Sequence, residues 1–228
     1  MYYKHRKAEA LPYPNYDESL GATVLSMSIN DLGVIVGALN VPSEFNSGLY
    51  RFYTDGTQAT AIGDTFNFIE TINDKNQIAN TQAEATCCHA TITSAAGQST
   101  VLWADPLCST SNWINDRNDL VGAYGCTTAR AYVYSGGAAT FLPAPATEAT
   151  GINDAGDIIG TETSGIFLYK NAVLYSISPD IRPRGDYSVL TIDCACFYAS
   201  YLGGLSERDE FIATRRGQFY LIMPSGKL

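Results

Sequence analysis

A ten-residue motif recurs along the chain and limits its possible folds more than any other feature. The most regular copy, at 151–160, reads GINDAGDIIG. Other copies begin at Ser28, Thr71 and Trp113, and a diverged copy begins at Gly204. The apolar second residues of successive copies lie 43, 42, 38 and 53 residues apart. This period is typical of solenoids and β-propellers, in which each repeat forms one supersecondary unit.

Each copy combines a tight turn with a short strand. An Asn-Asp pair, replaced by Ser206-Glu207 in the fifth copy, is followed two residues later by Gly, Asn or Asp, the residue types that best tolerate positive φ. Asn and Asp side chains also hydrogen-bond to nearby backbone, so the motif predicts a hairpin turn. The β-branched apolar pair after the turn predicts a strand, since it is too short for a helix. The predicted structural turn residues are Asn30, Asp31, Gly33, Asn73, Asp74, Asn76, Asn115, Asp116, Asn118, Asn153, Asp154 and Gly156.

A third and a fourth strand are expected after each turn. The third ends on an aromatic residue in four copies, at Tyr53, Trp103, Tyr134 and Tyr169, and we expect these side chains to pack between repeats. Four hairpin-linked antiparallel strands make one propeller blade. We therefore predict an all-β fold: a single domain over 1–228 that forms a five-bladed β-propeller of four-stranded antiparallel blades. The predicted blades are at about 22–63, 65–108, 109–145, 147–178 and 199–228.

The fifth copy ends without a fourth strand, and the N-terminal segment offers a replacement. Residues 11–14 (LPYP) resemble 142–145 (LPAP), the end of the third predicted blade. We expect a strand at about 6–14 to pair with the last blade and close the ring, because closure removes exposed sheet edges.

The repeat resembles the bacterial extracellular HAF repeat family, whose unit centres on Ile-Asn-x-x-Gly-x-x-x-Gly followed by an aromatic-rich strand and an Asp-Gly-like turn. The resemblance covers nearly all of 20–228, and the fifth copy departs from it at Ser206, Glu207, Asp209 and Ala213. It implies propeller-like repeats and a secreted or surface location. It supplies no catalytic residue to transfer.

Charge and composition narrow the classes of partner. The net charge of −9 and only 14 Lys+Arg disfavour nucleic-acid binding, which needs a basic face. No apolar run reaches the length of a membrane span. The first residues (MYYKHRK) are basic without an apolar stretch behind them, so no signal-peptide pattern is evident, and a cytosolic location stays open. We expect a monomer without a cofactor.

The six cysteines favour disulfides and an oxidising compartment. Cys87, Cys88 and His89 with nearby cysteines carry zinc-type ligands, but the close Cys-x-x-Cys pair of structural zinc sites is absent. One Asp per turn does not converge as calcium requires, so no metal is expected. The pairing of the cysteines stays open. The disulfide candidates are Cys87, Cys88, Cys108, Cys126, Cys194 and Cys196.

Function is expected on the face that carries the irregular segments. Connections between second and third strands, and between blades, share one end of a propeller, so we expect 40–48, 82–97, 106–112 and 179–199 there, with all six cysteines. Variable loops on a rigid frame commonly form binding sites. Candidate ligand-binding residues are Trp113, Phe45, Tyr187, Phe197, Tyr198, Tyr201, Glu70 and Glu148, although packing under a loop is an alternative role for each aromatic residue.

Three functions fit these features. The favoured one is a secreted or surface-exposed module that recognises a glycan or a protein through the cysteine-bearing loop face. The second is a glycoside hydrolase-type enzyme with Glu70 and Glu148 at the central channel, since such enzymes use paired carboxylates. The third is a structural repeat protein without a dedicated ligand.

Overall fold

Strands account for all the regular structure in the described part of the chain. The computed structural model describes residues 2–4, 7–9, 23–40, 48–53, 60–63, 67–83, 87–103, 107–125, 128–163, 165–177, 182–183, 205–208, 210–215 and 218–222. These residues contain no helix, and hence none that could span a membrane. They form four four-stranded antiparallel sheets, one three-stranded sheet and one two-stranded sheet.

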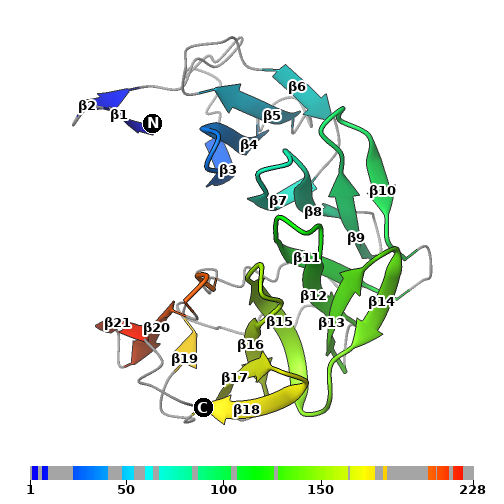
Figure 1. The fold of residues 1–228 in the computed structure, drawn as a ribbon. Coiled ribbons are helices and arrows are strands. Elements are labelled where there is room, and N and C mark those ends of the chain that lie inside the picture. Colours follow the sequence, from blue (N-terminus) through cyan, green and yellow to red (C-terminus); the bar gives the residue numbers. More distant parts are fainter. Residues whose placement is uncertain are drawn as a thin grey trace.

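The four-stranded sheets follow one another around an arc, with β3, β7, β11 and β15 nearest its centre (Figure 1). In each sheet the strands pair in sequence order. The predicted all-β architecture of four-stranded antiparallel blades is therefore confirmed for these sheets, which we call blades one to four. Blade one holds β3 (Thr23–Ile29), β4 (Val34–Asn40), β5 (Gly48–Tyr53) and β6 (Thr60–Gly63), and blade two β7 (Asn67–Ile72), β8 (Ile78–Ala83), β9 (Cys88–Thr93) and β10 (Ser99–Val101). Blade three holds β11 (Ser109–Ile114), β12 (Leu120–Tyr124), β13 (Arg130–Ser135) and β14 (Ala138–Phe141), and blade four β15 (Ala146–Ile152), β16 (Ile158–Glu162), β17 (Gly165–Lys170) and β18 (Val173–Ile177).

The third strand of blade two is not where the sequence pattern put it. The predicted insertion 82–97 contains β9, and Val101 belongs to the fourth strand, β10. Thr93, opposite Ile78, takes the register position that Tyr134 and Tyr169 hold in blades three and four. The apolar run at 101–103 suggested a strand, but Trp103 lies beyond β10 and packs on the core between blades two and three. Trp103 is therefore not equivalent to Tyr134 and Tyr169. Nor is Tyr53, since in blade one Phe52 holds this position, opposite Ile35.

Both ends of the chain differ from the predicted ring closure. The last sheet, blade five, contains β19 (Arg182–Pro183), β20 (Phe211–Arg215) and β21 (Gln218–Ile222), so a strand lies inside the connection predicted at 179–199. At the other end, β1 (Tyr2–Lys4) pairs with β2 (Lys7–Glu9). Strand β2 overlaps the predicted closing strand, and within the described residues it pairs with β1 only.

The predicted turns are present, and their positive-φ residues are the expected ones. The φ angles are 77° at Gly33, 59° at Asn76, 73° at Asn118 and 88° at Gly156. Asparagine therefore replaces glycine in two turns without changing the backbone, because it tolerates this region better than most residues.

The asparagine of each turn bonds both its own turn and the next blade. The Oδ1 of Asn115 accepts from the N–H groups of Arg117 (3.0 Å) and Asp119 (2.8 Å). Its Nδ2 donates to the Asn153 carbonyl at 2.9 Å. The same donor bond joins Asn30 to Asn73 and Asn73 to Asn115 at 2.9 Å, and Asn153 to Ser206 at 3.2 Å.

The acidic residue of each turn adds a second bond. The backbone N–H of Asp116 donates to the Asp154 carboxylate at 2.8 Å. Each pair of neighbouring turns, which we call a junction, thus has one bond from a side-chain amide to a carbonyl and one from a backbone amide to a carboxylate. In the first two junctions the side-chain amide also donates to the Oδ1 of Asn76 (2.9 Å) or Asn118 (3.4 Å). The carboxylates are turn residues, as predicted, but they also bind the preceding turn. The remaining acidic bonds are Asp31 to Asp74 (2.8 Å), Asp74 to Asp116 (2.7 Å) and Asp154 to Glu207 (2.8 Å).

Apolar residues from the motif fill the space between blades. Ile152 packs with Val121 and Ala131 of blade three, and Leu205 packs with Ile159 and Ile166 of blade four. From the second repeat on, each repeat therefore buries its motif Ile or Leu against the blade before it.

The last glycine of the motif lies close to both neighbouring strands. A Cβ at Gly160 would lie 2.0 Å from the carbonyl oxygen of Glu148 in the first strand and 2.7 Å from the Phe167 ring of the third. In blade two Asn80 stands at this position, opposite Thr91 rather than an aromatic residue.

We expect Asn115→Ala to lower the free energy of unfolding by about 3 kcal/mol, because it removes several buried hydrogen bonds and leaves their partners unpaired. Urea denaturation gives the measurement. Lys75→Ala is the control: Lys75 is exposed, and Ala155 naturally fills the same position in the fourth turn. A loss no larger than that of the control contradicts a bonding role for Asn115.

Candidate functional site

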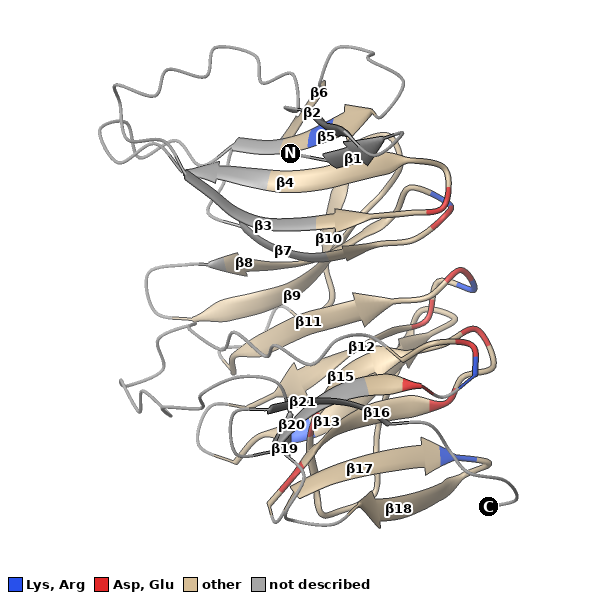
Figure 2. Ribbon diagram, turned by 90° about the vertical axis from the view of Figure 1, so that its left-hand side faces the viewer, with Lys and Arg blue, Asp and Glu red and all other residues tan. Residues whose placement is uncertain are grey.

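The two ends of the blades differ in chemistry. At one end lie the motif turns, and their charged residues line one side of the molecule in Figure 2. At the opposite end, the loop end, lie the connections between second and third strands and between blades. Residues 107–108 and 125 belong to two such connections, and the Gly125 N–H donates to the Cys108 carbonyl at 2.7 Å. These two connections of blade three therefore lie side by side at the loop end. The predicted insertion 82–97 does not lie wholly at this end, because residues 94–98 form the turn between β9 and β10, and Arg51 binds the carbonyls of both Ser94 and Asn76.

The described cysteines sit at this end. Cys88 is disulfide-bonded. Cys87 is buried and Cys108 is half-buried. Cys126, Cys194 and Cys196 lie outside the described residues, so the connectivity stays a prediction. No group of three or more His, Cys, Asp or Glu residues suited to a metal is present within the described part of the chain.

Half-buried Glu148 and buried Asn112 form a polar pair between the inner strands of blades three and four. Asn112 is 5% exposed, and its Nδ2 donates to Glu148 Oε1 and to the Ala149 carbonyl, both at 2.9 Å. Burial of the Glu148 carboxyl raises its pKa from 4.5 to about 7, and the Asn112 hydrogen bond opposes the rise. A carboxyl group with this pKa can exchange a proton near neutral pH.

A β-bulge takes Asn112 out of the regular ladder, whereas Glu148 is paired with Thr161. The pairing of β11 with β12 skips Asn112, and the pairing of β7 with β8 skips Glu70 at the corresponding place. In β15, the skipped residues are Thr147 and Thr150. Bulges redirect side chains and occur frequently beside functional sites. Glu148 was predicted as a candidate, whereas Asn112 was missed; its polar character at an inner-strand position was the available signal.

Of the other predicted ligand-binding residues, the structure describes Trp113 in full and Glu70 in its backbone only. Trp113 is half-buried and packs against the core shared by blades three and four, so packing, the alternative role, describes its position. Glu70 lies in the β7 bulge, and its side chain is not described. The remaining candidates lie outside the described residues: Phe45, Tyr187, Phe197, Tyr198 and Tyr201.

Aromatic residues and an arginine support the loop end of blade three. The Trp103 and Tyr132 rings meet edge to face, with centroids 4.3 Å apart. The Arg130 guanidinium lies 4.1 Å from the centre of the Phe141 ring, a cation–π contact at the beginning of β13. These contacts fix the strands from which the adjoining connections emerge.

Comparisons with known proteins identify the fold. No family model matches the chain, and no curated protein matches it. Among solved structures, TolB from Acinetobacter baumannii is 15% identical with a TM-score of 0.56, over 86% of this chain and 54% of that one. An oligogalacturonate lyase in complex with manganese is 14% identical with a TM-score of 0.60, over 87% of this chain and 65% of that one. The chain thus spans less than two thirds of the length of either protein. Both are β-propeller proteins, and the likeness concerns the fold alone.

We expect the stability of the protein to fall as the pH rises from 4.5 to 7. The Glu148 pKa is higher in the folded state than in the unfolded chain, so folding favours the protonated form. The stabilisation is complete below the ordinary pKa of 4.5 and is lost as the carboxyl ionises near 7, by up to about 3 kcal/mol.

Urea midpoints at pH 5 and pH 8 measure this effect, with Glu148→Gln as the matched variant. Glutamine keeps an acceptor for Asn112 and cannot ionise, so the variant should lose this part of the pH dependence. The same pH dependence in both proteins contradicts the assignment to Glu148.

Proposed function

We propose that the protein is a secreted or surface-exposed binding module that recognises a glycan or another protein through its loop end. The supporting observation is the separation of roles between the two ends. Junction hydrogen bonds hold the turn end, while connections of unequal length and the disulfide-bonded Cys88 lie at the loop end. The sequence and length of the connections at the loop end can therefore vary without disturbing the packing of the blades.

The chemistry of the loop end suits recognition by contact. Leu107 is 47% exposed beside Cys108, and Arg130 lies over the Phe141 ring in the same blade. Exposed apolar groups next to aromatic rings and charged groups can contact the apolar face of a sugar or a protein side chain. A disulfide restricts the conformations of its connection, which lowers the entropy lost on binding.

Two exposed apolar residues at opposite ends test this proposal. We expect Leu107→Asp to weaken binding by about tenfold or more, because it places a charge on the proposed surface, which corresponds to about 1.4 kcal/mol. Val173→Asp is the matched control, since Val173 is 46% exposed and begins β18 at the turn end.

The measurement starts from a glycan array and a panel of extracellular proteins probed with the parent protein, followed by titration of the strongest hit with both variants. Equal losses in the two variants, or a loss only in Val173→Asp, contradict recognition at the loop end. No binding by the parent across both panels favours a structural repeat protein without a dedicated ligand.

A glycoside hydrolase-type enzyme is the second candidate, and Glu148 is the observation that favours it. A carboxyl with a pKa of about 7 suits a general acid at neutral pH. The second carboxylate would come from Glu70, which occupies the bulge of β7. We expect Glu148→Gln to lower any hydrolysis of oligosaccharides by at least about a hundredfold, with Glu210→Gln at the turn end as the control. Unchanged turnover in Glu148→Gln excludes this candidate.

The closed form of the fold is also part of the proposal. We propose that a segment within 6–14 adds a strand to the last sheet, so that five blades complete a ring. This contact is supported by the three-stranded state of the sheet β19–β20–β21 and by the resemblance of 11–14 to the end of blade three. The secreted or surface location rests on the cysteine content and on the repeat resemblance.

A further inference from the structure

The first turn has the groups that could bind a preceding turn, but the described residues place no turn there. The later turns each bind the turn before them. Ile29 is 58% exposed, whereas the equivalent residues are almost fully buried: Ile72 at 6%, Ile114 at 2%, Ile152 at 2% and Leu205 at 5%. Each of those residues packs against the blade before it; Ile72, for example, contacts Val34 and Val36 of blade one. Ile29 is exposed because the described chain places no blade in front of it.

The hydrogen-bond acceptors of the first turn show the same incompleteness. The carboxylates of the later turns each accept a backbone N–H of the preceding turn at 2.7–2.8 Å. The Asp31 carboxylate accepts no such bond within the described residues, and its side chain is exposed. Likewise, the Asn30 carbonyl accepts from Gly33 of its own turn but, among the described residues, from no side-chain amide of another blade. The first turn therefore offers a carboxylate and one further carbonyl lone pair beside an exposed apolar residue.

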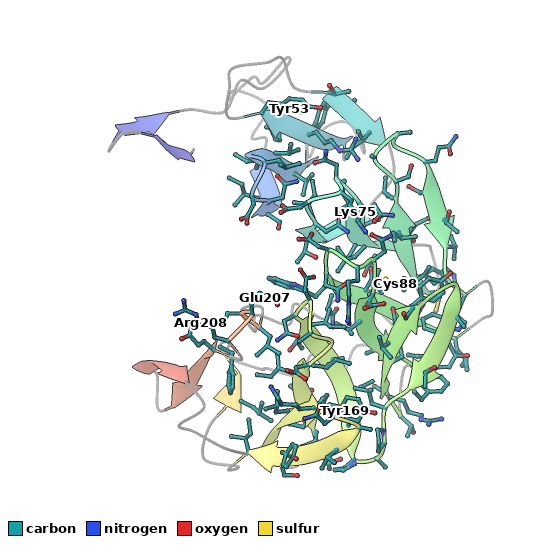
Figure 3. All side chains as sticks on the ribbon, in the orientation of Figure 1. Tyr53, Lys75, Cys88, Tyr169, Glu207 and Arg208 are labelled. Atoms are coloured by element: carbon teal, nitrogen blue, oxygen red, sulfur yellow. The ribbon has the colours of Figure 1, made fainter. Side chains whose placement is uncertain are left out.

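The complementary half lies at the other end of the chain. In the fifth turn, the carbonyl of Ser206 and the carboxylate of Glu207 accept from Asn153 and Asp154, so the acceptors of this turn are in use. The Glu207 N–H corresponds to the N–H groups of Asp31, Asp74, Asp116 and Asp154, which donate to the following turn. Among the described residues this N–H has no acceptor. Glu207 and Arg208 border the same opening in the ring as β3 (Figure 3).

We propose that the first and fifth turns of one chain form a fifth junction, in which the Glu207 N–H donates to the Asp31 carboxylate and Ile29 packs against the last sheet. The two halves are different surfaces, so their contact either closes a ring or links chains head to tail. Because both halves belong to one chain, their effective concentration is high, which favours closure within the chain. The described strands leave the two turns apart, and the proposal concerns their contact in solution.

The fifth junction is weaker than the other four. Ser206 replaces the asparagine, and its Oγ accepts from the N–H groups of Arg208 (3.2 Å) and Glu210 (3.0 Å), as Asn Oδ1 does in the other turns. A serine has no side-chain amide to extend to the Asn30 carbonyl. The junction therefore lacks one of its two hydrogen bonds, and the ring opens there first. This inference is independent of the binding proposal, because its test measures an amide and not a ligand.

Amide hydrogen exchange followed by NMR tests the junction on the full chain. We expect the Glu207 amide to be protected in the parent protein, although less than the Asp154 amide, because its junction is weaker. Asp31→Ala should increase exchange at Glu207 by at least about tenfold, because it removes the acceptor. It should leave exchange at Asp154 unchanged, which shows that the variant is folded. Leu32→Ala is the control, since Leu32 is 64% exposed in the same turn and provides no acceptor.

Three results overturn the proposal. One is rapid exchange of the Glu207 amide in the parent. Another is protection that Asp31→Ala does not reduce while Asp154 stays protected. The third is protection that rises with protein concentration, together with a dimeric or larger mass by light scattering, which assigns the contact to a second copy. Asp31→Asn, which retains an acceptor oxygen, should keep more protection than Asp31→Ala; equal loss in the two variants also counts against the bond.

Discussion

The side-chain amide of the turn asparagine is the interaction on which the arrangement of the blades depends. Its oxygen closes the turn, and its nitrogen binds the carbonyl of the next turn, so one side chain fixes both the hairpin and the neighbouring blade. Aspartate lacks the donor, and serine lacks the reach. The buried state of Asn73, Asn115 and Asn153, between 2% and 5% exposed, raises the cost of losing any of these bonds. Because these bonds fix the distance between neighbouring blades at the turn end, the connections at the loop end can differ in length.

The local structure of the turns could be predicted from the sequence, but their mutual bonds could not. Positive φ at Asn76 and Asn118 followed from the residue types that replace glycine. The bonds between turns join residues 38 to 53 positions apart, and a single repeat shows only that its Asn and Asp suit a turn. The recurrence of both residues in four copies was the available signal, since a turn alone tolerates many other pairs.

Blade two was the least predictable because its packing differs from the repeat. An aromatic residue lies opposite the glycine in blades three and four, where Tyr132 faces Gly122 and Phe167 faces Gly160. Blade two has Asn80 opposite Thr91, so its third strand lacks the aromatic residue that marks the others. The pattern therefore pointed to the apolar run ending at Trp103. For the candidate site, Glu148 was found by its place near an inner strand, whereas Asn112 needed the bulge that brings it across to blade four.

Because blade two lacks this aromatic residue, polar groups contribute to its contact with blade three. Within blade two, the hydroxyl of Thr93 donates to Asn80 Oδ1 at 2.9 Å. Between the two blades, the Ser111 N–H donates to Thr81 Oγ1 at 3.1 Å. The Ser109 hydroxyl also accepts from the Ala90 N–H at 2.9 Å. Hydrogen bonds between buried groups depend on direction, whereas apolar packing tolerates small shifts. The polar contact therefore fixes the relative position of these blades more closely, and the connections that it positions include Cys88 and Cys108. This hydrogen-bonded contact matters most for the irregular connections at the loop end. A rigid frame beneath them lowers the conformational entropy that the connections lose on binding a ligand.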